Sequence, residues 1–445
     1  MFIRVILQNI IERILMDKIL LKCNMGAQAK KVSRTTPNIA NVTIPDFLLD
    51  LPKQYKGPQT VDRDIKTNGA NAMVYTTIPE QFSSAPEHPD GHTQCMLMGT
   101  TEAQIVRSPL YLTQPIPKVA VGTVIIKTAS EGAGLGMFAG RDIKFGEFIV
   151  AERPLLMHPA DFLYNPGAAG VHYYTYEQHM AIMRHEIEIG LEVALGRMSD
   201  QNQAAYKSLF NSHTEDGPLL GIMRTNAFGV NIDELTRTTS AANLPKVYSI
   251  VTKDGSRINH RYIFISENID FITALTRSPP KKKSCVPNVC QKFSITSFSN
   301  QIIAIRDIKA GEEILYPYCD LLLPVAGLRE ALAPYGFTCS CRTCSTASPE
   351  SDGFRQTCHE NVARYQRIYD LALELGEGTD DIKKMVLRPA AELRGRMQEE
   401  GLGGMSEQFV GVTILLHKAY TKVGMEEEAK ELHAFLKTWV LFDGA

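Results

Sequence analysis

The sequence lacks the features that would place it in a membrane or on nucleic acid. No run in its 445 residues approaches the roughly 20 consecutive apolar residues that cross a bilayer. It also lacks an excess of one charge, with 47 Lys and Arg against 49 Asp and Glu, and such a chain does not favour nucleic acid or an anionic membrane as its main partner. We therefore expect neither partner. With 44% hydrophobic residues, the chain has the composition of a globular protein of two or three domains.

Cysteine is scarce in the first 284 residues, which contain only Cys23 and Cys95 of the nine cysteines. The apolar N-terminus also lacks an unbroken hydrophobic core, because Glu12 and Asp17 interrupt it, so we expect no secretory signal. An odd, clustered set of cysteines then indicates reduced thiols, for which metal binding is a more common use than disulfides. We expect a cytoplasmic and/or nuclear protein.

Composition and periodicity divide the chain into four regions. Residues 1–120, rich in Pro, Gly, Thr and Asn, predict a loosely ordered arm. Short β-branched runs between glycine turns predict a β-rich domain over 121–335, with a helical insertion at about 165–228. A cysteine-bearing segment at 336–350 precedes amphipathic helical patterns over 351–445. No internal repeat is strong enough to name, and the predicted fold class is α+β.

Glycines at 132, 134 and 136 would let a ligand approach the backbone. A dinucleotide-binding motif needs a helix to open from the last glycine, but the sequence continues as FAGRDIKFGEFIVAE, which is typical of strands. A nicotinamide cofactor is therefore not expected. From these residues alone, a glycine-rich β-turn is the simpler interpretation.

Three cysteines, Cys339, Cys341 and Cys344, lie within six residues. A zinc ion can collect thiolates at this spacing and needs one further ligand. The leading candidate is Cys285, and the others are Cys290, Cys319 and Cys358. The alternative, unliganded surface thiols, is disfavoured because exposed clustered cysteines oxidise readily.

Five motifs, in this order along the chain, resemble those of the SET-domain protein lysine methyltransferases. They are GLGMFAGRDIKFGEFIVAE from Gly134, RINH at 257–260, SCVPN at 284–288, GEEILYPY at 311–318 and YGFTCSCRTC at 335–344. The resemblance is close over about residues 120–345. The spacing and the helical tail are most similar to the SET-and-MYND branch, although the zinc cysteines of a MYND finger are missing.

The resemblance implies a SET-type β-clip fold of small sheets with a helical insertion and a knot-like cofactor site, followed by a zinc-binding post-SET segment and an α-helical C-terminal domain. It also implies transfer of methyl groups from S-adenosylmethionine to a lysine of a histone or another protein. The lysine must attack as a neutral amine, and a narrow aromatic channel that removes water lowers its pKa and aligns it. The catalytic residue implied is Tyr318, whose hydroxyl would lie beside the methyl group.

The resemblance also assigns the remaining site residues. The cofactor-binding residues are Gly134, Leu135, Gly136, Met137, Phe138, Asn259, His260 and Phe337. The substrate channel contains Asn226, Phe228 and Tyr316, with ordinary packing as the alternative for the first two. A structural zinc ion is held by Cys285, Cys339, Cys341 and Cys344.

The sequence departs from the family at two places. Ala133 stands where many relatives have a basic residue, which puts one ligand contact in doubt. The 23 residues 261–283 separate His260 from Ser284 and so break the continuous RINHSCxPN of the family. If Arg261 is encoded by AGG and Ser284 by AGT or AGC, splicing within these codons would restore that motif, so we interpret the segment as a translated retained intron. A genuine loop insertion is the alternative.

Two functions of different class follow from these observations. The first is a protein-lysine N-methyltransferase that acts on a lysine-bearing protein as a monomer. The second is a catalytically inactive, zinc-stabilised SET-fold interaction module, which the insertion and Ala133 favour, whereas Tyr318 and Asn259-His260 argue against it. A zinc-finger nucleic-acid binder would need a basic face near the cysteines, which is missing.

Overall fold

The computed structural model describes most of the chain from residue 73 onward. The described residues are 73–80, 88–98, 101–128, 135–160, 175–232, 247–258, 287–316, 321–332, 342–345, 348–403 and 406–443.

The described residues form three small β-sheets. The largest has the strand order β1-β2-β6-β8-β7, in which β2 and β6 are parallel and the other neighbours antiparallel. The second has the order β5-β10-β9 and the third is the hairpin β3-β4. The bounds are β1 Met73–Ile78, β2 Thr93–Met98, β3 Val124–Thr128, β4 Leu135–Ala139, β5 Phe148–Glu152, β6 Leu156–Pro159, β7 Phe228–Asn231, β8 Val247–Val251, β9 Val289–Ser294 and β10 Ser299–Ala304.

Strands β1 and β2 lie in the region for which the sequence predicts a loosely ordered arm, and here the structure differs from the prediction. They pair in register from Met73 opposite Met98 to Ile78 opposite Thr93. Ile78 and Leu97 are buried in the core, as is Ile105 in the short helix α3, Thr101–Arg107. The order of this region therefore comes from burial against distant strands rather than from local sequence preference.

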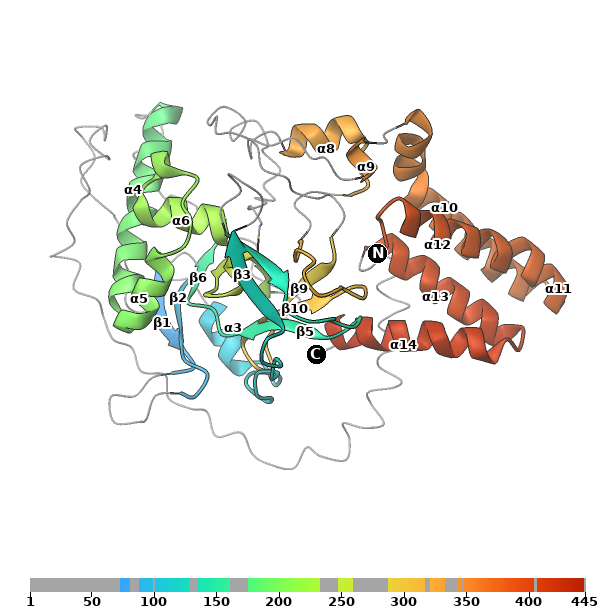
Figure 1. Ribbon diagram of the computed structural model, residues 1–445, viewed down its shortest axis with the longest axis horizontal. Helices are drawn as coiled ribbons and strands as arrows, with labels where there is room; N and C mark the ends of the chain where they lie inside the picture. Colours follow the sequence, from blue (N-terminus) through green and yellow to red (C-terminus); the bar gives the residue numbers. More distant parts are fainter. Residues whose placement is uncertain are drawn as a thin grey trace. The chain divides into compact units, whose positions relative to one another are not determined.

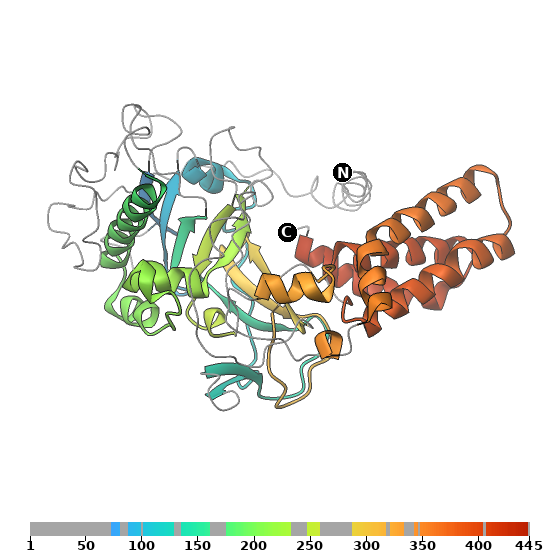
Figure 2. The same cartoon turned by 90° about the horizontal axis from the view of Figure 1, so that it is seen from above.

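Helices α4 (Tyr176–Gly196), α5 (Asp200–Lys207) and α6 (Pro218–Asn226) lie together beside the five-stranded sheet, as Figures 1 and 2 show. Their apolar faces form a cluster with residues of β1, β2, β6 and β8, including Met96 and Leu156. α4 begins at a capping box, in which the Thr175 hydroxyl accepts the Gln178 N–H and the Gln178 side chain accepts the Thr175 N–H.

The chain contains an internal repeat that the sequence reading did not name. Residues 141–147 read RDIKFGE and residues 306–312 read RDIKAGE. The two turns face each other, and Ile143 and Ile308 exchange backbone hydrogen bonds of 2.8 and 2.9 Å. Gly146 and Gly311 occupy equivalent positions with φ of 82° and 84°, which glycine adopts without steric cost.

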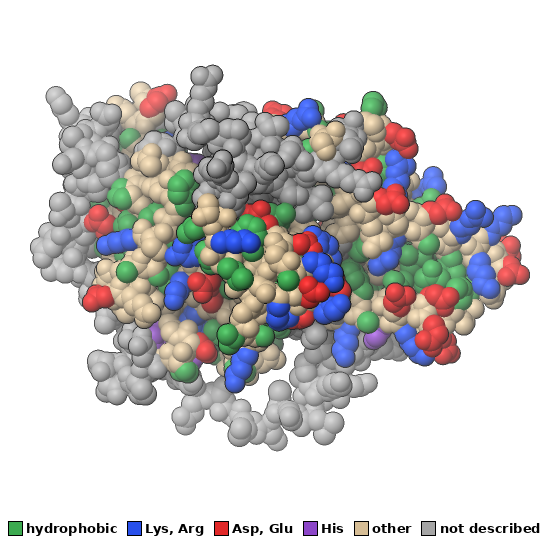
Figure 3. Space-filling model, viewed as in Figure 1, with side chains coloured by type: hydrophobic (Ala, Val, Ile, Leu, Met, Phe, Trp, Pro, Cys, Tyr) green, Lys and Arg blue, Asp and Glu red, His purple; other side chains and the backbone are tan. Residues whose placement is uncertain are grey.

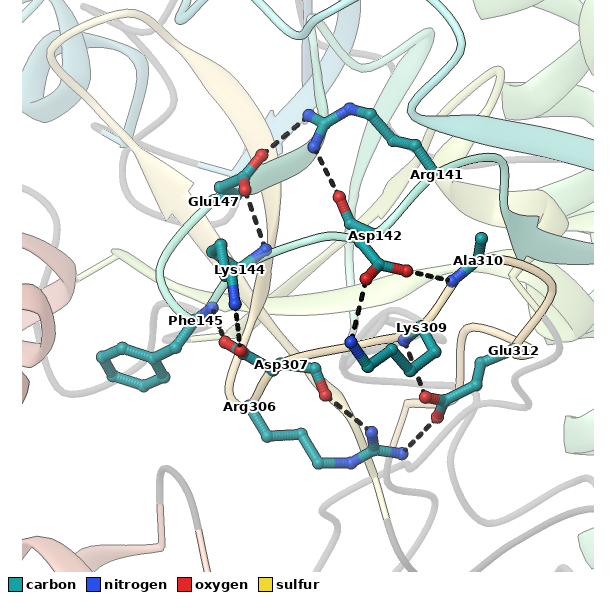
Figure 4. A network of polar contacts seen from close by, with 10 residues as sticks. All are labelled: Arg141, Asp142, Lys144, Phe145, Glu147, Arg306, Asp307, Lys309, Ala310 and Glu312. Atoms are coloured by element: carbon teal, nitrogen blue, oxygen red, sulfur yellow. Dashed lines mark hydrogen bonds and ion pairs between the residues drawn. The ribbon is translucent and has the colours of Figure 1, made fainter.

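Side chains repeat the same symmetry around this contact (Figure 4). Lys144 pairs with Asp307 at 2.7 Å, and Lys309 pairs with Asp142 at 2.9 Å. Within each turn, the arginine pairs with the glutamate, at 2.7 Å for Arg141–Glu147 and 2.9 Å for Arg306–Glu312. The repeat therefore places the start of β5 and the segment that follows residue 310 in matching positions.

Ala347–Ala445 belong to a compact unit separate from the one that contains the sheets. Its described helices are α10 (Pro349–Glu374), α11 (Thr379–Ile382), a π-helical segment (Lys383–Leu387), α12 (Arg388–Glu399), α13 (Glu407–Lys422) and α14 (Glu426–Asp443). The central helix is α13, which packs against α10, α12 and α14. Of the helices that the structure describes, none is both long and apolar enough to cross a bilayer.

Candidate functional site

The segment after the second repeat pairs with strand β4. Ala139 donates its N–H to the Glu312 carbonyl, and Ile314 donates its N–H to the Met137 carbonyl, both at 2.8 Å. Phe138 lies opposite Glu313 in the resulting antiparallel bridge. The GEEILY motif and the LGMFA motif, about 175 residues apart in sequence, therefore lie side by side.

Asn288 connects the SCVPN motif to the same segment. Its side chain, fully buried, donates to the Glu313 carbonyl at 2.8 Å and accepts the Leu315 N–H at 2.7 Å. Its backbone N–H donates to the Leu315 carbonyl at 3.0 Å. A buried polar side chain with these hydrogen bonds satisfied holds the strand in one register.

Tyr316 ends this described segment and contacts Phe228. The two rings meet edge to face, with centroids 5.6 Å apart and an interplanar angle of 84°. Phe228 is the first residue of β7 and is buried, and burial raises the pKa of Tyr316 to about 12. Two of the three residues predicted for the substrate channel are therefore in contact, and Tyr316 keeps its phenolic proton at neutral pH.

Asn226, the third of these residues, is buried at the end of α6. Its side-chain amide donates to the carbonyls of Phe210 and Ile222, at 2.7 Å each. Both amide hydrogens are therefore used inside the protein, which agrees with the packing interpretation for this nitrogen. The Asn226 carbonyl accepts the Ser256 hydroxyl at 2.9 Å, so the RTNAFGV segment is joined to the segment that leads into RINH.

The cofactor-binding residues predicted on β4 differ in exposure. Leu135 is 54% exposed, whereas Met137 is fully buried in the core and its carbonyl already accepts the Ile314 N–H. The Lys127 ammonium lies 4.3 Å from the centroid of the Phe138 ring, in cation–π geometry. Of these residues, Leu135 is therefore open to a ligand, whereas Gly136 and Met137 are buried.

Ile258 of the RINH motif is buried in the core at 1% exposure. The residues that follow it, Asn259 and His260, lie outside the described residues. The other predicted site residues outside the described residues are Gly134, Cys285, Tyr318, Phe337, Cys339 and Cys341.

Of the four predicted zinc ligands, the structure describes Cys344. It is buried at 2% exposure in the single-turn helix α9 (Arg342–Ser345), and its carbonyl accepts a hydrogen bond from Arg329 of α8 (Val325–Leu332). Within the described ranges, no group of three or more His, Cys, Asp or Glu side chains could hold a metal ion. Burial raises the pKa of Cys290 to about 12 and that of Cys358 to about 11, so both are protonated at neutral pH.

Sequence reasoning missed three residues that organise the site. Asn288 stands in a motif that the sequence singles out, but nothing local showed that its side chain holds the Leu315 backbone. Ser256 and Glu152 act on segments 30 and 102 residues away. Only the tertiary fold brings these groups together, so the signal was not in the local sequence.

Comparison with known proteins follows the same motifs. Residues 134–319 match the SET domain family. The histone-lysine N-methyltransferase set5 of Schizosaccharomyces pombe is 28% identical over 236 residues, which cover 53% of this chain and 54% of that protein. The N-lysine methyltransferases SMYD2-B and SMYD2-A of Xenopus laevis are 41% and 27% identical over 144 residues, 32% of this chain and 33% of each relative.

The chain thus spans about half the length of the first relative and a third of the other two. Among solved structures, the SET domain of LSMT bound to lysine and AdoHcy is 13% identical, and the match covers 71% of this chain and 88% of that chain. Its TM-score of 0.23 is too low to support a structural conclusion. The family match and the relatives nevertheless agree with the motif order and with the α+β arrangement of small sheets and helices. Residues 134–319 of the chain therefore match a SET domain, and the chain is similar in sequence to the lysine methyltransferases set5 and SMYD2.

Proposed function

We propose that the protein is an S-adenosylmethionine-dependent protein-lysine N-methyltransferase. The observation that carries this proposal is that strand β4, Asn288 and Phe228 all meet the strand segment of the GEEILY motif. Residues 312–316 pair with β4, are held by Asn288 and end at Tyr316 against Phe228. An aromatic wall next to a glycine-containing strand is an arrangement that suits a lysine side chain and a methyl donor.

The aromatic wall has a chemical role in this proposal. An ammonium group has no lone pair, so the substrate lysine must lose its proton before it attacks. Contact with Phe228 and Tyr316 removes water from the amine, and desolvation lowers the pKa of a lysine. S-adenosylmethionine supplies the methyl group when bound, and the hydroxyl of Tyr318, two residues after Tyr316, would lie beside it.

The residues present fit the cofactor at the start of β4. Leu135 is exposed, so a ligand could approach β4 at this residue, whereas the next residue, Gly136, is buried. Asn259 and His260 would hold the amino-acid and adenine portions, and Phe337 would stack on the adenine. Met137 is fully buried and its carbonyl accepts the Ile314 N–H, so in this structure Met137 itself is closed to a ligand.

The finer features of the fold belong to the same proposal. Cys285, Cys339, Cys341 and Cys344 would hold a structural zinc ion, and the buried position of Cys344 is compatible with a ligand that points inward. The zinc would order the segment that presents Phe337. The segment with Asn259 and His260 would thread beneath a neighbouring loop to form a knot-like cofactor pocket.

The proposed partner is a lysine-bearing protein, histone or non-histone, methylated by a monomer in the cytoplasm and/or nucleus. The near balance of basic and acidic residues in the sequence favours a protein over a nucleic acid as the partner. On the face drawn in Figure 3, the coloured Lys and Arg side chains are interspersed with Asp and Glu, which agrees with the net charge of −2.

The 23 residues 261–283 decide which form of the chain would be active. They separate His260 from Cys285, whereas in the continuous motif of the family the cysteine is the second residue after the histidine. We propose that the 445-residue chain binds S-adenosylmethionine weakly or not at all and is poorly soluble, whereas the 422-residue chain without the segment binds it. Exposing the apolar stretch within RYIFISENIDFITAL would favour aggregation.

Calorimetric titration of both forms with S-adenosylmethionine tests the proposal. We expect binding by the 422-residue form and little or none by the 445-residue form, while NAD, the matched adenosine-containing control, binds neither. Equal affinity in both forms would show that the segment is a tolerated loop. No binding in either form would contradict the proposed function.

A further inference from the structure

The carboxylate of Glu152 holds a backbone turn that lies about 100 residues further along the chain. Glu152 is the last residue of β5, and its Oε1 accepts the Gly255 N–H at 2.6 Å. Both carboxylate oxygens also accept the Asp254 N–H, at 3.0 and 3.1 Å. These contacts constrain the turn most strongly when Glu152 is ionised, because hydrogen bonds to an ionised acceptor are about twice as strong as neutral ones.

Burial of the Glu152 carboxylate costs free energy, because the ionised form loses contact with water. Burial raises its pKa to about 7, and the neighbouring charge of Asp254 also raises it, while the N–H groups and Thr252 lower it. Among the residues that the structure describes, no Lys or Arg forms an ion pair with it. A desolvated carboxylate whose described partners are backbone N–H groups and a hydroxyl is placed to fix that backbone.

The turn itself is built to accept the carboxylate. Thr252 and Ser256 exchange hydrogen bonds, each hydroxyl accepting the backbone N–H of the other at 3.0 Å. A side chain at Gly255 would not fit, because its Cβ would lie 2.8 Å from the Thr252 hydroxyl and 3.3 Å from the Glu152 Oε1. Glycine is therefore required for the close approach of the backbone to Glu152.

This turn leads directly into the predicted cofactor-binding residues. Ser256 donates to the Asn226 carbonyl on the substrate side, and Ile258 is buried in the core. Asn259 and His260 come next in the sequence. A change in the direction of the turn at 254–257 would shift Ser256 and Ile258, and Ile258 directly precedes Asn259 in the sequence.

We propose that Glu152 is a positioning residue that fixes the turn before Asn259 and His260 and so sets their place for S-adenosylmethionine. The inference rests on the proposed methyltransferase function. Glu152 acts through the backbone of Asp254 and Gly255 and does not itself touch the cofactor.

The test uses three variants and one matched control, in the 445-residue and 422-residue chains. Glu152→Ala removes the acceptor, Glu152→Gln keeps one acceptor oxygen, and Gly255→Ala crowds the turn with Glu152 intact. The control is Glu147→Gln, because Glu147 also accepts a backbone N–H, from Lys144 at 2.8 Å, but in the remote ion-pair cluster. Gly255→Ala and Glu152→Gln keep the test decisive if Glu152→Ala fails to fold.

Hydrogen-exchange mass spectrometry without cofactor gives the first readout. We expect exchange of the peptide Thr252–Ile258 to accelerate about tenfold or more in Glu152→Ala and Gly255→Ala, less in Glu152→Gln and not in Glu147→Gln, since a charge-assisted bond is lost. No change in this peptide would overturn the proposal. An equal acceleration in β8 and β10 would also overturn it, because that pattern indicates general destabilisation.

Titration with S-adenosylmethionine gives the second readout, in the form whose unmodified chain binds. We expect Glu152→Ala to weaken binding about tenfold or more, with partial recovery in Glu152→Gln and a smaller effect on turnover at saturating cofactor. Unchanged affinity despite a loosened turn would overturn the proposal. Absence of binding by the unmodified chain in both forms would contradict the methyltransferase function instead, and the exchange readout would still decide whether Glu152 holds the turn.

Discussion

Asn288 and Leu315 hydrogen-bond to each other in both directions: the Asn288 side chain accepts the Leu315 N–H at 2.7 Å, and the Asn288 N–H donates to the Leu315 carbonyl at 3.0 Å. This pair fixes the strand that ends at Tyr316, and hence the position of one wall of the proposed lysine channel. Its energetic importance is directly testable.

Replacing Asn288 with Ala should destabilise the domain by about 2–4 kcal/mol, since Leu315 loses its acceptor in a buried site and a small cavity remains. Urea unfolding measures the change. Asn361→Ala is the control, because Asn361 makes only a 3.4 Å side-chain contact on the surface of α10. A loss for Asn288→Ala no larger than that of the control would show that the pair does not hold the strand.

The two RDIKxGE turns predict matched effects of matched substitutions. Asp142→Asn removes the pairing with Lys309, and Asp307→Asn removes the equivalent pairing with Lys144. Both aspartates are about half exposed, so each change should lower the Tm slightly and by a similar amount, and the difference should shrink in 1 M NaCl. Melting curves at low and high salt measure this. A large effect at one position only would contradict the symmetry.

The stability of the protein should depend on pH because of the buried side chain of Glu188. It accepts the N–H groups of Leu219 and Leu220 at the start of α6, and burial raises its pKa to about 7, with Glu192 and Asp216 nearby. Because the folded chain binds this proton more tightly than the unfolded chain, the contribution of Glu188 is greatest below about pH 4.5 and is lost as the pH rises to 7.

The Tm difference between the unmodified chain and Glu188→Gln should therefore shift against the unmodified chain as the pH rises from 5 to 8. Thermal melting across this range measures it. Glu177→Gln, at an exposed position in the first turn of α4, should show no such trend. A constant difference for Glu188→Gln would mean that Glu188 titrates outside the range.

Zinc content should depend on Cys344 and not on Cys358. Both are buried cysteines, but Cys344 belongs to the clustered set and Cys358 lies in α10. Cys344→Ser and Cys285→Ser should lose the zinc measured by mass spectrometry of the purified protein, and chelation should weaken cofactor binding as well as stability. Full zinc content in Cys344→Ser would contradict the ligand assignment.

Local sequence signals predicted where strands of the SET domain lie better than they predicted which strands pair with each other. Gly-bearing turns and β-branched runs indicated strands near Leu135–Ala139 and Phe148–Glu152, and the structure confirms them. β1 and β2 were missed, because polar neighbours hide their apolar runs and their order depends on pairing with β6. The RDIKxGE repeat was present in the sequence, but only the facing turns give it structural meaning.

In the candidate site, too, some residues could be assigned from the sequence, whereas some contacts are seen only in the folded structure. The family resemblance predicted that Phe228 and Tyr316 would line one channel, and their ring contact places them together. The link from Glu152 to Gly255 had no local signal, because it joins residues 103 positions apart through a backbone N–H, which every residue but proline offers. The assignments of Tyr318, Asn259, His260 and Phe337 lie outside the described residues and stay predictions.

The most direct test of the proposed activity is transfer of labelled methyl groups from S-adenosylmethionine to a lysine-rich protein mixture by the 422-residue form, with Tyr318→Phe as the matched variant. We predict labelled methyl-lysine with the unmodified form and a loss of about a hundredfold in Tyr318→Phe with cofactor affinity nearly unchanged, since the hydroxyl acts mainly in the transition state. No incorporation by a form that binds the cofactor, or equal incorporation by Tyr318→Phe, would contradict it.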